Sequence, residues 1–270
     1  MKQGEAPADA DRAILAKIAS GEKIGSLQGS SSKYRELATG ILLQYADSEM
    51  AGGAGYAGVL SQAPSLDERV RLAAIMYEKL SLAQKTYQLV RETGINIDKY
   101  IASHCWESRL ERNVVLGYRR ASGDKRLNAL LYPLQGWSDQ AVFTFLMASM
   151  ACLQLEDFTK SSLYSWSQLA LSHLPVERTH KEFGFACIER LSHVESELGQ
   201  MQLSMRYWYQ KVLVCFGSPH SERNSQYLEY ALKCSRNEEI AGRWETELWD
   251  ELSVLGIYPP RDAYGSCSNT

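Results

Sequence analysis

Long segments of apolar residues at helical spacing constrain the fold of this chain more than any other feature. The apolar pattern repeats every three to four positions over residues 34–50, 65–94, 139–155, 167–198, 202–216 and 224–255, and only 7 prolines interrupt the 270 residues. Long periodic segments with few helix breakers are typical of helical proteins. We therefore predict an all-α fold.

The composition indicates a single folded domain. A hydrophobic content of 45% and a charged content of 23% are ordinary for a globular protein. The net charge of −3, without a block of Lys or Arg, gives no attraction to nucleic acid. We expect a flexible or loosely docked N-terminal arm over residues 1–32, a helical domain over residues 33–260 and a disordered tail over residues 261–270.

The sequence also predicts a cytoplasmic protein with no membrane contact. The N-terminal arm is polar and contains no apolar stretch long enough for a signal peptide or a membrane span. Residues 139–155 are apolar on all sides, but the stretch is short and is followed by charged residues, as in the central helix of a bundle. The 6 cysteines lack Cys-x-x-Cys spacing, which fits buried free thiols in a reducing compartment.

Glycine, proline and capping residues predict where the helices begin and end. Four glycines between residues 51 and 62 indicate a loop. Ser65 is expected to cap the next helix, Gly94 to close it, and Pro175 to kink the segment 167–198. Residues 95–134 are irregular, with a short helix expected near residues 98–116 and a mobile basic loop after it.

Glu177 and His180 form a Glu-x-x-His pair in the segment 167–198. Residues three apart lie on the same side of a helix, so both side chains can reach one point in a bundle core. Ferritin-like bundles hold two iron ions with two such pairs and two further Glu residues. Taken alone, the pair is weak evidence for a metal site, because helix surfaces carry such pairs by chance. Glu49 adds to it, since this carboxylate lies on an apolar stripe and needs a partner.

Several short stretches, taken in order, resemble the phenylacetate-catabolism oxygenase family, in particular the catalytic subunits of phenylacetyl-CoA epoxidase. The matching stretches are Tyr34-Arg35, Ser48-Glu49, Ala63-Pro64, Tyr132-Pro133 to Trp137, Glu177-x-x-His180 with Gly184-Phe185, Phe216-Gly217 and Leu255-Gly256. They keep the family's order and spacing over roughly residues 34–260. The resemblance implies a ferritin-like four-helix bundle with additional C-terminal helices and non-haem di-iron monooxygenase chemistry.

The resemblance places only part of the family's metal-ligand set in this chain. Glu49, Glu177 and His180 stand where the family has ligands. Counting from Ala63-Pro64, the other Glu-x-x-His pair falls on Lys79 and on a leucine, Leu82.

The third-helix carboxylate of the family is also replaced. Counting from Trp137, it falls on Ala148. Three of the six ligands are therefore retained, and we expect no conventional di-iron centre. Lys79 puts a cation where the metal would lie, and a buried ammonium between Glu49 and Glu177 would neutralise both carboxylates. In a shifted register Glu78 would point inward instead, but Ser81 rather than His would then follow it.

Three functions remain open on this basis. The first, which we favour, is a structural subunit without catalysis that binds a paralogous ferritin-like subunit or a second copy of itself, because the family's complexes contain such a subunit. The second is an active oxygenase or oxidase with one iron or manganese ion at Glu49, Glu177 and His180, or with metal-free chemistry at Lys79 as a base or nucleophile. The third is a helical interaction protein without a ligand, which the retained polar residues oppose.

Four basic residues lie close together in the irregular segment: Arg119, Arg120, Lys125 and Arg126. One interpretation is a solvated connection between helices, and the other is an anion-binding loop. If the chain keeps the acyl-CoA substrate of the family, a CoA phosphate could bind at this loop.

Overall fold

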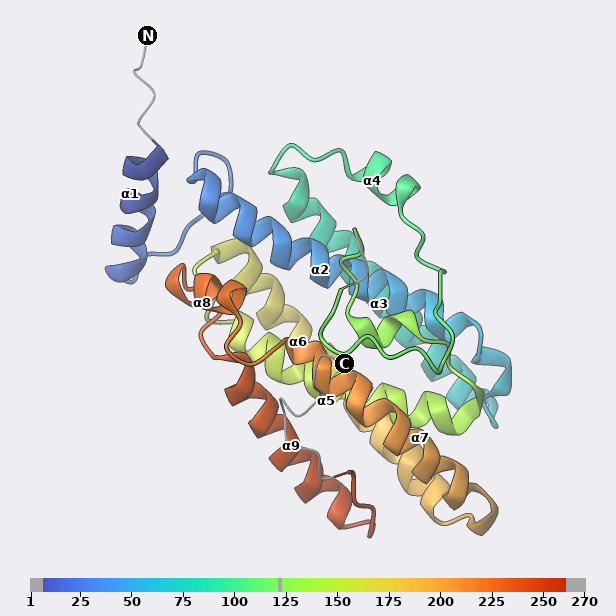
Figure 1. The fold of residues 1–270 in the computed structure, drawn as a ribbon. Helices are drawn as coiled ribbons and strands as arrows, with labels where there is room; N and C mark the ends of the chain where they lie inside the picture. The colour runs from blue at the N-terminus through green and yellow to red at the C-terminus, as the bar shows by residue number, and fades with distance from the viewer. Residues whose placement is uncertain (1–6, 121–122, 261–270) are drawn as a thin grey trace.

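The computed structural model describes residues 7–120 and 123–260. Over these residues the chain forms helices and short 3-10 turns, with no strand and one isolated bridge between Ile24 and Leu163. The bundle consists of α2 (Ser32–Ala57), α3 (Leu66–Arg91), α5 (Gly136–Phe158) and α6 (Tyr164–Ser192). Helix α2 packs along α3, and α5 packs along α6 (Figure 1). The predicted all-α, ferritin-like bundle is confirmed.

Further helices pack around the bundle. They are α1 (Pro7–Ala19), α4 (Ile97–Ser103), α7 (Glu195–Leu213), α8 (Glu222–Glu229) and α9 (Asn237–Ser253). Both α7 and α9 contact α5, so the additional C-terminal helices lie against the bundle (Figure 1). Helix α6 continues through Pro175, and α7 begins earlier than residue 202, where we expected it.

The single helix expected over residues 224–255 is in fact two, α8 and α9. The break is stabilised by tertiary contacts that the apolar pattern does not show. Ala231 has a left-handed backbone with φ 47°. The Asp157 carboxylate of α5 accepts the Cys234 backbone N–H at 3.0 Å, which ties the connecting segment to the bundle.

The glycines of residues 51–57 lie in α2 and not in the loop that we predicted. Gly52 and Gly53 face α3 at close range: a Cβ atom at Gly52 would come within 3.2 Å of Lys79 Cδ, and one at Gly53 within 3.0 Å of Leu80 Cγ. The glycines therefore allow two helices to approach each other and do not end the first one.

The predicted limits of α3 agree with the structure. Ser65 is the N-cap, with its Oγ accepting the Glu68 backbone N–H at 3.2 Å and the Glu68 carboxylate accepting the Ser65 N–H at 3.1 Å. The helix ends at Arg91, and Gly94 follows with φ 85°. This capping box satisfies N–H groups that have no partner inside the helix.

The N-terminal segment, which we expected to be a flexible or loosely docked arm, packs against the bundle from residue 7 onward. Ile14, Ile24 and Leu27 are buried in an apolar cluster with α2. The Ile24 N–H donates to Ser162 O at 2.8 Å, and the Tyr164 N–H donates to Ile24 O at 2.9 Å. Residues 1–6 and the predicted tail over residues 261–270 lie outside the described residues.

The irregular segment after α3 contains a shorter helix than expected, α4, and is attached to the bundle by a buried carboxylate. Asp47 on α2 accepts hydrogen bonds from Tyr87 Oη at 2.7 Å and from Tyr100 Oη at 2.6 Å. Burial raises the pKa of Asp47, although these hydrogen bonds oppose the rise. The first part of the segment is thus anchored by side chains that the sequence pattern did not single out.

Helix α5 is the core helix of the bundle. Among the described helices it alone is long and apolar enough to cross a membrane, and 83% of its most apolar window is buried inside the fold. Such burial is expected for the core helix of a soluble protein. Of the cysteines in the described residues, Cys152, Cys187 and Cys215 are buried and Cys105 and Cys234 exposed, and all five are free.

Candidate functional site

The ammonium group of Lys79 lies between two buried carboxylates. Its Nζ is 3.2 Å from Glu49 Oε2 and 3.3 Å from Glu177 Oε1. The three side chains come from α3, α2 and α6, and their exposed fractions are 9%, 8% and 2%. The structure therefore brings these three predicted site residues into direct contact, and the fourth, His180, contacts Glu177.

Lys79, Glu49 and Glu177 form an ionic cluster whose position follows from the apolar packing around it. Buried apolar residues form two clusters, and the ionic residues lie where these meet in the middle of the bundle. On α2, Glu49 lies between Ala46 of one cluster and Ala51 of the other. Both clusters are apolar, so each charge depends largely on its charged neighbours for compensation.

Mutual compensation determines the charge states. Burial alone would lower the pKa of Lys79, but the negative charges of Glu177 and Glu49 raise it well above its ordinary value. Burial opposes ionisation of Glu177, yet Lys79 and His180 together lower its pKa to about 2. For Glu49 burial dominates and raises the pKa, with Lys79 offsetting part of the effect. Lys79 is accordingly a protonated cation at neutral pH.

His180 extends the cluster toward the surface. Its Nδ1 lies 3.1 Å from Glu177 Oε2, and its Nε2 lies 2.6 Å from Glu78 Oε2. Glu78 is 30% exposed and also contacts Arg71, with an Nη1 to Oε2 distance of 3.3 Å. We had considered Glu78 only in a shifted register. The structure needs no shift, because adjacent residues of α3 reach different parts of the same network.

Both nitrogens of His180 face a carboxylate. A neutral imidazole has one N–H, so both contacts are hydrogen bonds only when a second proton is present on the ring or on a carboxyl group. If the His180 ring carries both protons, the network contains three cations and three carboxylates. The cations are Lys79, Arg71 and His180, and the carboxylates are Glu49, Glu177 and Glu78. The cluster is then electrically neutral as a whole.

The residues present do not match the six-ligand set of a di-iron centre. Leu82 on α3 and Ala148 on α5 stand where the family resemblance expects ligands, and each is only 2% exposed. The Lys79 ammonium lies in contact with two of the three retained ligands, where it would repel a metal cation. The retained carboxylates therefore have a cationic partner already.

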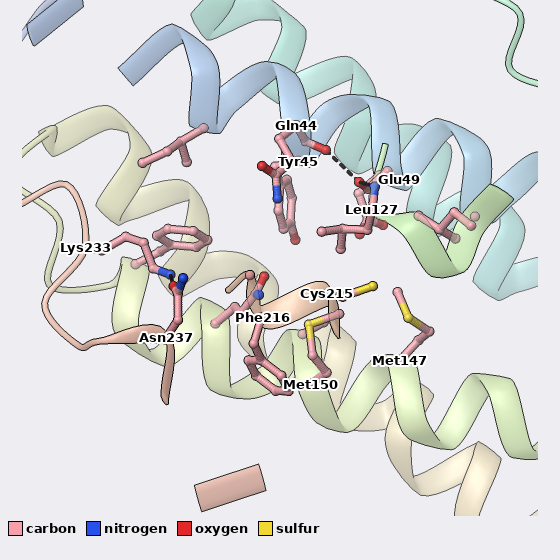
Figure 2. Close-up of a pocket in the computed structure, with 18 of the residues that line it drawn as sticks. Gln44, Tyr45, Glu49, Leu127, Met147, Met150, Cys215, Phe216, Lys233 and Asn237 are labelled. Carbon is pink, nitrogen blue, oxygen red and sulfur yellow. Dashed lines mark hydrogen bonds between the residues drawn. The ribbon is translucent and has the colours of Figure 1, made fainter. Parts of the chain in front are cut away.

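The ionic cluster borders a pocket of about 350 Å³ (Figure 2). The lining includes Glu49, Lys79 and Glu177, together with apolar and aromatic side chains, among them Tyr45, Phe143, Met147, Met150 and Phe216. A second cavity of about 330 Å³ shares Gln44, Arg120 and Arg223 with the first, so the two adjoin. The arrangement can hold an amphipathic molecule next to the buried charges.

The four residues of the predicted basic cluster have different environments. Arg120 lines both cavities and Lys125 lines the second, whereas Arg119 lines neither. Arg126 is 3% exposed, and its guanidinium contacts the Asp124 carboxylate at 2.6 Å. It also donates to two backbone carbonyl oxygens, so it stabilises the loop and is not available to a ligand.

Sequence reasoning missed the polar side of the pocket that Lys233 and Asn237 form. Figure 2 shows these two side chains together, away from Glu49. Their spacing of four fits one face of a helix, and we had assigned them to a continuous helix. A lysine at such a position is usually solvated, so the sequence carried no signal for its burial.

Comparison with known proteins assigns the family. No curated protein matches this chain. The sequence model of the family described as phenylacetic acid catabolic protein matches residues 24–267. This match spans every helix from α2 to α9 and includes the whole ionic cluster. The chain is therefore a ferritin-like member of the phenylacetic acid catabolic protein family.

Proposed function

We propose that this chain is a non-catalytic, metal-free subunit of a phenylacetyl-CoA-epoxidase-type system. The observation that carries the proposal is the Lys79 ammonium at 3.2 Å from Glu49 and 3.3 Å from Glu177. One buried cation satisfies both carboxylates, so the bundle needs no metal to keep them in its core. The protein then serves as a structural partner of a catalytic subunit.

The partner in this proposal is a paralogous ferritin-like subunit, or a second copy of the chain. Four large apolar side chains lie on one side of α3 and are exposed: Leu66 (74%), Val70 (62%), Tyr77 (72%) and Leu80 (41%). Their spacing of four, seven and three positions keeps them on a single stripe of the helix. Such a stripe supports docking against a helical partner.

An acyl-CoA is the ligand that fits this proposal. The apolar pocket could hold an acyl group, and Arg120, Arg223 and Lys125 at the adjoining cavity could bind phosphate oxygens. The hydrogen bonds of Arg120 among the described residues go to the backbone oxygens of Lys125 and Arg126. Its charge is therefore not used in an ion pair there.

The alternative is an active oxygenase or oxidase with one iron or manganese ion at Glu49, Glu177 and His180. The pocket next to these residues favours it, because a substrate could reach them. Metal-free chemistry at Lys79 is less well supported. Two carboxylates raise the pKa of Lys79, and a base or nucleophile needs the opposite shift.

Metal analysis separates the two functions. The natural chain would be purified without added metal, then loaded anaerobically with Fe(II), and its iron content measured. A Lys79→Glu, Leu82→His variant provides the matched control, because it restores the second Glu-x-x-His pair. We expect almost no iron in the natural chain and clear binding in the variant. About one or two equivalents in the natural chain would exclude the metal-free subunit.

The partner is tested by co-expression with the paralogous ferritin-like subunits of the same genome. The mass of the purified assembly would be measured by light scattering, with a Val70→Asp, Tyr77→Asp variant alongside. We expect a hetero-oligomer, or a homo-oligomer, that the variant loses while its helical circular dichroism is unchanged. A natural chain that stays monomeric with every paralogue would contradict the structural role.

A further inference from the structure

Lys233 is a buried cation on the wall of the pocket. It lies between α8 and α9, is 8% exposed and lines the cavity. Its Nζ donates one hydrogen bond, to Asn237 Oδ1 at 3.0 Å (Figure 2). An ammonium has three N–H donors, so this contact uses one of them and leaves two on a side chain that lines the cavity.

No ion pair within 4.0 Å is formed by Lys233 among the described residues. Asp157 attracts it through space, but the Asp157 carboxylate is engaged by the Cys234 backbone N–H at 3.0 and 3.2 Å. Burial lowers the pKa of Lys233, and the negative charge of Asp157 opposes this shift only in part. Lys79 differs, because two carboxylates contact it in the same pocket.

A second donor without a partner lines the pocket. Asn224 is 6% exposed, and its side-chain Nδ2 has no hydrogen-bond partner in the part of the chain that the structure describes. Its Oδ1 accepts the Asn237 backbone N–H at 3.2 Å, and Asn237 Nδ2 donates to Ser218 O at 3.1 Å. These contacts occupy the acceptors of this wall and leave donors of Lys233 and Asn224 unused.

A buried cation and an unused amide donor require an acceptor-rich, negatively charged group. We propose that Lys233, Asn224 and Asn237 form an anion subsite that binds the carboxylate of an amphipathic acid. The apolar body of the acid lies along Met150, Phe158 and Phe216, which line the same pocket. A carboxylate there compensates Lys233 as Glu49 and Glu177 compensate Lys79.

The proposed subsite does not depend on whether a metal binds at Glu49, Glu177 and His180. It uses no residue of the ionic cluster, and it specifies the charge of the ligand at a different part of the pocket. A carboxylate on the ligand distinguishes this subsite from the basic groups of the adjoining cavity, which would suit a phosphate.

Calorimetric titration with octanoate and with its neutral analogue octanamide tests the proposal at pH 7. We expect octanoate to bind the natural chain about tenfold more tightly than octanamide. Lys233→Met should abolish most of this preference and leave octanamide binding unchanged. Lys160→Met is the matched control, because Lys160 is exposed and lines neither cavity.

Thermal unfolding of the same variants shows whether a loss of binding comes from loss of the fold. Methionine removes the buried charge and keeps the length of the side chain, so Lys233→Met should melt no lower than the natural chain. Equal binding of octanoate and octanamide, no binding of octanoate, or unchanged octanoate binding in Lys233→Met would each overturn the proposal. Coenzyme A binding that depends on Lys233 in place of octanoate would assign the subsite to phosphate.

Discussion

Gly52 on α2 lies directly against the side chain of Lys79 on α3. A Cβ atom at Gly52 would come within 3.2 Å of Lys79 Cδ. The lysine stem uses this space on its way to Glu49, which precedes Gly52 by three positions on the same helix. Glycine inside a helix costs roughly 0.5–1 kcal/mol relative to alanine. The close packing of α2 on α3 and the ionic cluster are therefore parts of one arrangement.

Replacing Lys79 by methionine should strongly destabilise the protein. The change leaves Glu49 and Glu177 buried without their shared cation, and breaking a buried ion pair typically costs about 3–5 kcal/mol. Urea unfolding at pH 7 would measure the loss. A triple variant with Lys79→Met, Glu49→Gln and Glu177→Gln carries no unpaired charge and should recover most of the stability. A single variant as stable as the natural chain would contradict the cluster.

His173 on α6 should make the stability depend on pH between 6.5 and about 4. Burial, with the positive charge of Lys85 adding to it, lowers the pKa of His173 from 6.5 to about 4. Below pH 6.5 the unfolded chain binds a proton that the folded chain does not, so stability is complete above pH 6.5 and falls as the pH drops.

The loss through His173 should reach roughly 2–3 kcal/mol by pH 4.5. A His173→Leu variant removes the titrating group and should flatten the curve over this window. Urea unfolding at half-unit pH steps would check the slope. The same slope in the natural chain and in the variant would show that His173 does not carry the effect.

Gly184→Ala should destabilise the contact between α5 and α6. A Cβ atom at Gly184 would lie 2.5 Å from the Phe145 backbone N and 2.7 Å from its Cα, so the helices would have to separate. We expect a loss of about 1–3 kcal/mol, the usual range for overpacking. The matched control is Gly242→Ala in α9, where a Cβ atom would come within 4 Å of no described residue outside the adjacent helix backbone.

The control should raise stability by up to about 1 kcal/mol, because alanine is the better helix former. Thermal unfolding of the two variants gives the comparison. Two variants that shift the melting temperature in the same direction would argue against the close approach at Phe145.

Tyr100→Phe should loosen the segment after α3. The Tyr100 hydroxyl donates to the buried Asp47 carboxylate at 2.6 Å, and a hydrogen bond to a charged group contributes about 1.5–3 kcal/mol. Hydrogen exchange followed by mass spectrometry should show faster exchange over residues 97–120. Tyr77→Phe, at an exposed position on α3, should leave that exchange unchanged. Equal protection in the two variants would mean that Asp47 does not anchor the segment.

The sequence was most informative where the structure is local. Helical spacing, Ser65 and Gly94 predicted the course of α3, because capping and amphipathic burial act within a few residues of the chain. Local signals failed where distant segments decide the conformation. The glycines near residue 52 looked like a loop because their partner, α3, is absent from the local pattern.

The sequence likewise predicted only some of the residues of the candidate site. The spacing of Glu177 and His180, and the resemblance that placed Lys79 opposite Glu49, were enough to predict a buried lysine among retained carboxylates. Glu78 and Lys233 were not predicted as site residues, because their roles depend on which neighbours surround them. A lysine side chain is solvated on an exposed helix surface, whereas burying its charge inside a pocket costs free energy.

From the sequence alone one can therefore determine the helical bundle, the family and the identity of the residues at the positions where the family resemblance expects ligands. Only the tertiary structure decided which charges meet. It placed the Lys79 ammonium between two carboxylates, joined Glu78 to His180, and left Lys233 on the pocket wall without an ion pair to any described residue. The physical reason is that hydrophobic periodicity can be read from the order of the residues. The energy of a buried charge depends instead on its distances to charged and polar groups that are remote in the sequence.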